Sequence, residues 1–248
     1  MNAFIGSPIR LATVHDVPRI GLVAAAGFQY SNFWDWERPY ADKYPEDTLK
    51  SYCLSFKNLI LNPCSAVWVA EDTYDEKEAH GPRHSLIESA YSQISLDAPK
   101  DQKVIVGVTA WVFPSDSDHC GKFKPDNPNN EAPGRGFRGR DTNSKHMDMV
   151  DEAAEEATKK YFPGCPELSM TVVHPSYWRR GHGSSMVKWG MDLAKENNET
   201  LGTISSTMGN ALCEALGWSR EDTIHLEGDD EAPDGLTFNV NTYNKNKD

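Results

Sequence analysis

A glycine-containing turn between an apolar strand and an amphipathic helix is the feature that most constrains this fold. Residues 168–173 are mostly apolar or β-branched and are stopped by a His-Pro pair, while 184–197 repeat apolar side chains at helical spacing. The turn between them contains Arg179, Arg180, Gly181, His182, Gly183 and Ser184. Because glycine allows close approach of the backbone, such a turn can direct several N–H groups and the positive end of a helix dipole at one anion. The sequence therefore predicts a pyrophosphate site at the start of this helix.

Two other phosphate-binding signatures are missing. The chain has no GxxxxGK[ST] motif, and the glycines at 181 and 183 lack the third glycine of GxGxxG. We therefore expect neither a P-loop nor a dinucleotide-binding motif. Arg179 and Arg180 add two cations that can make charge-assisted contacts to a phosphate.

The remaining periodicities predict an α/β chain with a mixed sheet. Strands rich in β-branched and aromatic residues are expected at 9–13, 65–70, 103–113, 168–173, 201–206, 222–226 and 236–243. Amphipathic or capped helices are expected at 15–28, 45–61, 145–161, 184–197 and 209–216. Strands and helices interleaved in this way typically form one sheet with helices packed on its faces.

Three segments depart from this pattern. Residues 72–102 and 114–146 carry mixed charge, prolines and glycines with little periodicity, so we expect polar loop insertions in a single domain covering 1–248. The second insertion contains one GRGFRGR run at 134–140, which we interpret as a flexible loop rather than an RNA-binding tract. Residues 28–40 are dense in aromatic side chains and are expected to form a loop between two helices.

The charge balance opposes binding to nucleic acid or to an anionic membrane. Asp and Glu number 37 against 25 Lys and Arg, which gives a formal net charge of -12. A field of that sign repels polyanions and suits a cationic amine, although acidity also serves solubility alone. No run approaches the roughly 18 apolar residues that a membrane-spanning helix needs.

The cysteines are odd in number and have no CxxC spacing, which argues against a disulfide framework or a zinc site. They are Cys53, Cys64, Cys120, Cys165 and Cys213. We therefore expect reduced thiols and no metal. The first ten residues have no basic flank followed by a long apolar run. The expected location is cytoplasmic, and a nuclear location is also compatible.

Two stretches of the sequence resemble the signatures of one enzyme superfamily. Val173-x-Pro175-x-Tyr177 followed by Gly181-x-Gly183 resembles motif A of the GNAT superfamily, written V-x-P-x-[YF]-[QR]-x-x-G-x-[GA]. Residues 206–218, which end in Leu-Gly-Trp, look like its second signature, a short helix ending in LYEKLGF. The resemblance covers most of the chain apart from the two insertions.

The resemblance implies a fold, a cosubstrate and a reaction. The GNAT fold is α/β, with a central mixed, mostly antiparallel sheet of six to seven strands, splayed at the fourth and fifth strands and flanked by helices. Acetyl-CoA is the implied cosubstrate, its pantetheine lying along the splayed strand, and the acetyl group passes to a primary amine by direct attack. Cofactor contacts are then expected from Val172, Val173, Arg179, Arg180, Gly181, His182, Gly183, Ser184, Ser206 and Asn210.

The resemblance is weaker where catalysis is concerned. Trp178 stands at the usual Gln or Arg position, and Cys213 stands where the second signature has a tyrosine that protonates the leaving thiolate. Cys213 is either that proton donor or a small buried apolar residue. Glu167 is the leading candidate for the general base, and His174 is the second.

The acceptor site is expected in the aromatic segment. Phe33, Trp34 and Trp36 can form a ring wall, with Asp35 or Glu37 holding an ammonium group, or the rings can instead form a small core between helices. The acceptor, a small molecule or a peptide amine, and the oligomeric state are not fixed by the sequence. Two further classes stay open: a noncatalytic acyl-CoA-binding or sensing module, and an interaction scaffold.

Overall fold

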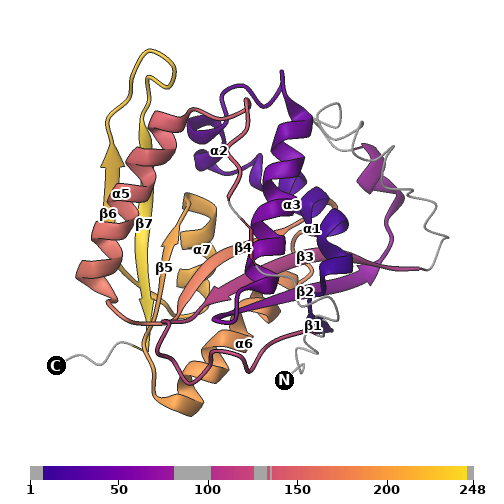
Figure 1. Cartoon of the computed structure of the whole chain (residues 1–248), viewed down its shortest axis with the longest axis vertical. Helices are drawn as coiled ribbons and strands as arrows, with labels where there is room; N and C mark the ends of the chain where they lie inside the picture. The colour runs from indigo at the N-terminus through magenta and orange to yellow at the C-terminus, as the bar shows by residue number, and fades with distance from the viewer. Residues whose placement is uncertain (1–7, 81–101, 126–132, 135, 245–248) are drawn as a thin grey trace.

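The computed structural model describes residues 8–80, 102–125, 133–134 and 136–244. Its strands form one sheet in the order β1-β2-β3-β4-β5-β7-β6, with helices on both faces (Figure 1). The strands are β1 Ile9–Leu11, β2 Ser65–Thr73, β3 Lys103–Val112, β4 Glu167–Val173, β5 Leu201–Ser205, β6 Ser219–Leu226 and β7 Leu236–Tyr243. Strand order and helix placement match the expected mixed α/β sheet.

The sheet opens between β4 and β5. Every other neighbouring pair of strands is antiparallel, whereas β4 and β5 run parallel and share a single register pair, Glu167 with Gly202. Because the two strands pair only at their beginning, they separate toward their C-terminal ends. The predicted splay at the fourth and fifth strands is confirmed.

The helices begin and end close to where the sequence places them. They are α1 Val17–Phe28, α2 Asn32–Glu37, α3 Pro45–Leu61, α5 Ser144–Tyr161, α6 His182–Asn197 and α7 Thr207–Ala215. Pro45 opens α3, and the side chains of Asn143 and Ser206 cap α5 and α7 by accepting hydrogen bonds from backbone N–H groups. These local signals explain why their N-termini were predictable.

The alternation of side chains along the central strands divides the core into two layers. Val67 and Val69 of β2 face α1 and α3, whereas Ala66 and Trp68 face the layer that contains α6. The C-terminal end of α1 lies very close to β4, because a Cβ on Gly27 would stand 2.9 Å from the Val173 carbonyl oxygen. Glycine at this position therefore lets α1 pack against the open edge of the sheet.

The expected loop at 28–40 is wrong in its centre. Residues Asn32–Glu37 form α2, whose N-cap Ser31 accepts a hydrogen bond from Phe33 N–H at 3.3 Å. Trp34 and Trp36 are both buried. The sequence-based interpretation relied on the modest helix propensity of aromatic residues. The Ser31 cap and the burial of the two indoles stabilise the helix enough to outweigh that low propensity.

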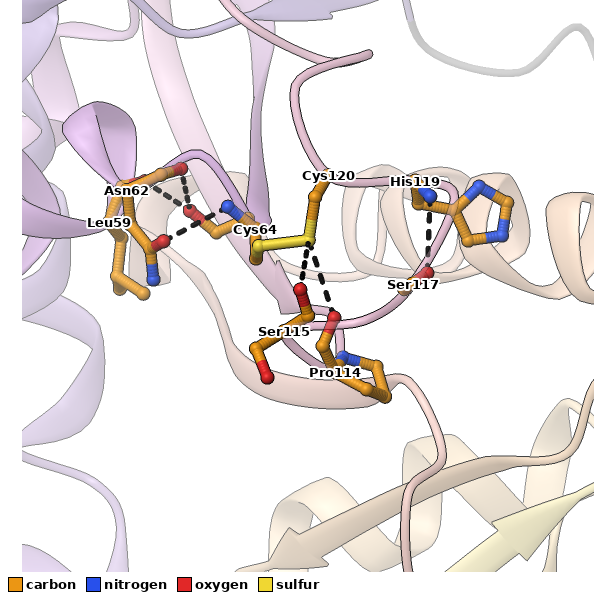
Figure 2. Close-up of a disulfide and its surroundings, with 9 residues drawn as sticks. Leu59, Asn62, Cys64, Pro114, Ser115, Ser117, His119 and Cys120 are labelled. Atoms are coloured by element: carbon orange, nitrogen blue, oxygen red, sulfur yellow. Dashed lines mark hydrogen bonds between the residues drawn. A yellow bond between two sulfur atoms is a disulfide. The ribbon is translucent and has the colours of Figure 1, made fainter.

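The expectation of five reduced thiols is also wrong. Cys64 and Cys120 form a disulfide with an S–S distance of 2.02 Å, whereas Cys53, Cys165 and Cys213 are free (Figure 2). The bridge ties the turn before β2 to the chain that follows β3, where Gly121 N–H also donates to the Pro63 carbonyl at 2.8 Å. The partners are 56 residues apart, so cysteine spacing gave no indication of the pair.

The bridge bears on the expected location. Persistent disulfides are rare in the reducing cytosol, so this one weighs against the cytoplasmic prediction, which stays untested. Within the described ranges no helix has the length and apolar character needed to cross a membrane. The single-domain assignment also stays a prediction, and much of both insertions (81–101, 126–132 and 135) lies outside the described residues.

Candidate active site

The gap between β4 and β5 opens into a cavity of about 330 Å³. One side is formed by residues of β4 and β5, which separate after Glu167, and by one face of α7. The other side is formed by α1, α2 and α3, and α5 contributes Val150 and Ala154. The cavity is therefore a direct result of the broken strand pairing.

The strand edge of β4 offers backbone groups to this gap. His174 N–H donates to the Val106 carbonyl of β3 at 2.8 Å, and Val172 is in register with Val108. Because successive residues of a strand direct their backbone groups to opposite edges, those of Val172 point to β3, whereas those of Thr171 and Val173 point to the gap. Of the two valines expected to present backbone groups to the cofactor, Val173 alone faces the open edge.

Trp178 also reaches this edge. Its indole Nε1–H donates to the Val173 carbonyl at 2.7 Å, and its ring meets Tyr30 edge-on. The indole thus occupies one lone pair of the strand-edge carbonyl, and the second remains for another donor. The unusual residue of the motif therefore packs beside the expected pantetheine path.

The turn at the start of α6 has the backbone conformation that an anion site needs. Gly181, the N-cap of α6, lies at φ 88°, and Arg179 also has a positive φ of 64°. Within the part of the chain that the structure describes, no atom beyond the two neighbouring residues lies within 4 Å of a Cβ built on Gly181, so the space beside this glycine is open. Glycine meets the left-handed requirement at 181 without strain, and the turn delivers the free N–H groups of α6 to that space.

Acidic residues at the end of β2 hold part of this turn. Arg180 pairs with Asp72 at 3.1 Å and Asp75 at 2.7 Å, and the buried His182 places Nε2 3.0 Å from the Asp72 carboxylate. Burial opposes the effect, but Thr73 N–H, His182 and Arg180 together hold the pKa of Asp72 below its usual range. Arg180 is therefore engaged by acids, while the exposed Arg179 makes no ion pair with another described residue.

Two of the three predicted catalytic residues line the cavity. Glu167 lines the cavity from the first position of β4, and burial raises the pKa of its carboxyl group. Cys213 is 2% exposed, and burial raises the pKa of its thiol to about 12. His174 does not line the cavity; its ring is buried beside Tyr177, and Nδ1 accepts from Ser176 N–H at 3.3 Å.

A second carboxylate, Glu37, lines the cavity from the last turn of α2. Burial raises the pKa of this carboxyl group to about 7, with neighbouring Arg38 opposing the shift. Its backbone carbonyl accepts from Asn143 N–H at 2.9 Å, which fixes the end of α2. The sequence placed Glu37 only as a possible ammonium partner. Its position three and four residues after Trp34 and Phe33 would have indicated a shared face had the segment been predicted as a helix.

The aromatic residues of α2 divide between the two expected roles, a wall of the acceptor site and a small core between helices. Phe33 and Trp34 line the cavity. Trp36 instead stacks on His146 with ring centres 3.9 Å apart and is 2% exposed, so it belongs to the core. Asp35 is exposed and outside the cavity wall. The acceptor proposal therefore keeps Phe33 and Trp34 and replaces Asp35 and Trp36 with Glu37.

A buried ion pair supports this wall. Arg38 is bonded to the fully buried carboxylate of Asp141, which also accepts from Thr48 at 2.8 Å. The guanidinium carbon lies 4.6 Å from the ring centre of Tyr52, a cavity residue. The described end of the second insertion thus holds α2 and α3 around the cavity.

The last two predicted cofactor residues differ in position. Ser206 lines the cavity and caps α7. Asn210 is buried and accepts from Asn241 Nδ2 at 2.8 Å, and Asn241 in turn accepts from Ser205, so its side chain serves the α7–β7 packing. Among the described residues no group of His, Cys, Asp and Glu is arranged to hold a metal ion.

Comparisons with known proteins agree with the fold. No family model matches the chain. A protein of Stachybotrys chartarum called an acetyltransferase is 28% identical over 237 residues, which cover 95% of this chain and 90% of that protein. A structure of histone acetyltransferase HPA2 and related acetyltransferase from Corynebacterium glutamicum superposes with a TM-score of 0.53 and 17% identity, covering 96% of each chain. Arylalkylamine N-acetyltransferase 2 from Aedes aegypti superposes at 0.50 and 10%, covering 95% of this chain and 97% of that one.

The parted parallel strands, the cavity between them and the glycine turn at the start of α6 form a candidate acyltransferase site. Over nearly its whole length the chain is similar in sequence to a protein called an acetyltransferase, and it shares the fold of acetyltransferase structures.

Proposed function

We propose that this protein transfers the acetyl group of acetyl-CoA to a primary amine held in the β4–β5 cavity. The observation that carries the proposal is the arrangement around β4: its pairing with β5 stops after Glu167, the gap between the two strands holds a cavity with two carboxylates, and the glycine turn follows β4 in the chain. The arylalkylamine N-acetyltransferase of similar fold supports an amine acceptor.

The N–H groups at the start of α6 and the exposed Arg179 would bind the pyrophosphate of CoA. The strand edge at Thr171 and Val173 would bind the pantetheine amides as an added strand does. This directs the thioester into the cavity, and the N–H groups of the same edge are positioned to donate to the oxyanion that forms there.

Glu37 is the proposed general base. A carboxyl group with a pKa near 7 is suited to accept a proton from an ammonium group at neutral pH. The freed amine attacks the thioester carbonyl, the C–S bond breaks, the nitrogen loses a second proton and the thiolate gains one. Cys213 is a poor donor for that last step because its pKa of about 12 lies well above the 8.5 or so of an ordinary thiol. Glu167 is the alternative base.

The test measures acetyl-CoA binding and transfer with the full chain. CoA and acetyl-CoA should raise the melting temperature, since a ligand that binds only the native state stabilises it. Release of CoA thiol should depend on an added amine. A folded chain whose melting curve is unmoved by millimolar CoA would refute the proposal, and binding without transfer to any amine would favour a noncatalytic acyl-CoA-binding module.

A pair of glycine variants locates the binding site. Gly181 and Gly164 both have positive φ, and neither would bring a Cβ within 4 Å of another atom, so alanine adds comparable backbone strain at each. Gly181→Ala should weaken CoA binding about fivefold or more, because roughly 1 kcal/mol of strain falls on the turn that holds the phosphates. Gly164→Ala should bind CoA as the wild type does.

A further inference from the structure

The cavity differs in chemistry from one side to the other. Its hydroxyl side chains lie mainly along β4 and β5, at Ser169, Thr171, Thr203 and Ser205. The opposite side is formed by four rings from α1, α2 and α3, namely Phe28, Phe33, Trp34 and Tyr52. A molecule in this cavity therefore meets backbone and hydroxyl groups at one end and aromatic rings at the other.

Three of the four rings pack on one another, and Phe33 packs on Phe238. Tyr52 stacks on Phe28, at a centroid distance of 5.4 Å and an interplanar angle of 23°, and on Trp34, at 6.3 Å and 19°. Arg38 lies over Tyr52 with its guanidinium carbon 4.6 Å from the ring centre. Near-parallel rings fixed in this way offer faces and edges to which a ligand ring adds in offset or edge-to-face geometry.

The charge of the cavity selects the sign of its occupant. Glu37 and Glu167 are part of the lining, and no Lys, Arg or His is found among the described residues that form it. A cationic group is therefore favoured beside the carboxylates, and an acidic acceptor is disfavoured.

The size of the cavity restricts the occupant further. Its volume of about 330 Å³ is at the low end of the range of roughly 300–1,000 Å³ found for small-molecule sites. Part of this volume, along the strands, is needed for the thioester. The remaining space suits one small molecule with a short chain and a flat apolar end.

We propose that the acceptor is a small primary amine joined by a short chain to one aromatic ring, with the amine at Glu37 and the ring against Trp34, Tyr52 and Phe33. The proposal rests on the acetyl transfer proposed above and narrows its acceptor. Polyamines and lysine side chains of peptides are the competing acceptors that it excludes.

The experiment compares two amines that differ only in the ring. 2-Phenylethylamine and 2-cyclohexylethylamine carry the same ammonium chain, so the ratio of their kcat/KM values isolates the aromatic contribution. We expect a ratio of about 2 to 10 in favour of the phenyl compound, the fold-change that corresponds to a favourable ring pair. Spermidine and a lysine-containing peptide should be acetylated more slowly than either.

Variants test whether the wall causes the preference. Trp34→Leu keeps an apolar side chain but removes the ring, and the ratio should fall toward 1. The matched control, Trp189→Leu, removes a partly buried indole that packs on Trp68 on the other face of the sheet, and should leave the ratio unchanged. Because the ratio compares two substrates on one protein, a loss of folded enzyme cancels. If Trp34→Leu does not fold, Phe33→Leu at a half-buried position serves instead.

The outcomes separate the two proposals. A ratio at or below 1 in the wild type, or faster acetylation of spermidine or the peptide, overturns the acceptor class while the acetyl transfer stands. A ratio above 1 that persists in both Trp34→Leu and Phe33→Leu overturns the assigned wall. Failure to bind acetyl-CoA, with no transfer to any amine, overturns the proposed function itself.

Discussion

Replacing Glu37 by glutamine tests the proposed base. The variant should lose activity toward the amine and gain stability against unfolding above neutral pH. The carboxyl group is half-buried in the cavity wall, and burial raises its pKa to about 7 from the ordinary value of 4.5. Glutamine keeps the shape of the side chain but cannot accept the proton. If Glu37 is the general base, the variant should lose about 100-fold or more in kcat/KM for the amine.

The sign of the stability change follows from the direction of the shift. An acid whose pKa is higher in the folded than in the unfolded state favours folding in its protonated form. That advantage is complete below pH 4.5 and declines as the pH rises through 7. The rise of the Glu37 pKa from 4.5 to about 7 corresponds to roughly 3 kcal/mol, and partial solvent access reduces this to about 1 to 3 kcal/mol. Glu37→Gln should therefore stabilise the protein at pH 8 by that amount more than at pH 5.

Urea unfolding at pH 5 and pH 8, together with pH profiles of kcat/KM, measures both effects. The wild type should show an acid limb near pH 7 that the variant lacks, because activity requires the ionised carboxylate. Glu156→Gln makes the same change on the exposed side of α5 and should alter neither property. A Glu37→Gln enzyme that keeps its rate and the limb near pH 7 would refute the assignment, and Glu167 would become the leading base.

Two further variants test the support of the site and the proton donor. Asp141→Asn leaves the buried guanidinium of Arg38 without its counter-charge, so it should lower the free energy of unfolding by about 3 to 5 kcal/mol in urea. The apolar double variant R38M/D141L should recover most of this loss. Equal losses in the two variants would contradict the reasoning. Cys213→Ala should keep its kcat at saturating substrates within a few fold of the wild type, because a thiol with a pKa of about 12 is a weak acid. A drop of about 100-fold in a normally folded variant would instead identify Cys213 as the proton donor.

The sequence was sufficient for those parts of the molecule that local signals determine. Helix α3 begins at Pro45 and α7 is capped by Ser206, both of which are visible in the sequence. The turn at Gly181 was predictable for the same reason, since a left-handed backbone position before a helix favours glycine. The splayed strands were predicted through the family resemblance and not from the residues themselves.

The parts that the sequence did not determine depend on contacts between distant residues. Glu37 becomes a candidate base through burial by segments far along the chain, and Cys64 meets Cys120 across 56 residues. Asp72, which lies at the edge of an apparent loop in the sequence, is bonded to His182 of the glycine turn. Contacts between residues far apart in the chain arise from tertiary packing. The strand and helix repeats of 2 and 3.6 residues therefore do not indicate them.

The two halves of the proposed site are supported by different sets of these distant contacts. The described end of the second insertion holds the acceptor side: Asp141 pairs with Arg38, Asn143 N–H bonds the Glu37 carbonyl at 2.9 Å, and the His146 ring stacks on Trp36. The cofactor side depends instead on Asp72 and Asp75, where the first insertion leaves β2. Because the two sets of contacts involve different segments, changes within 136–146 should alter the choice of amine while the turn at Gly181 keeps its geometry. The described ends of the two insertions thus support the proposed site, one on its amine side and the other on its cofactor side.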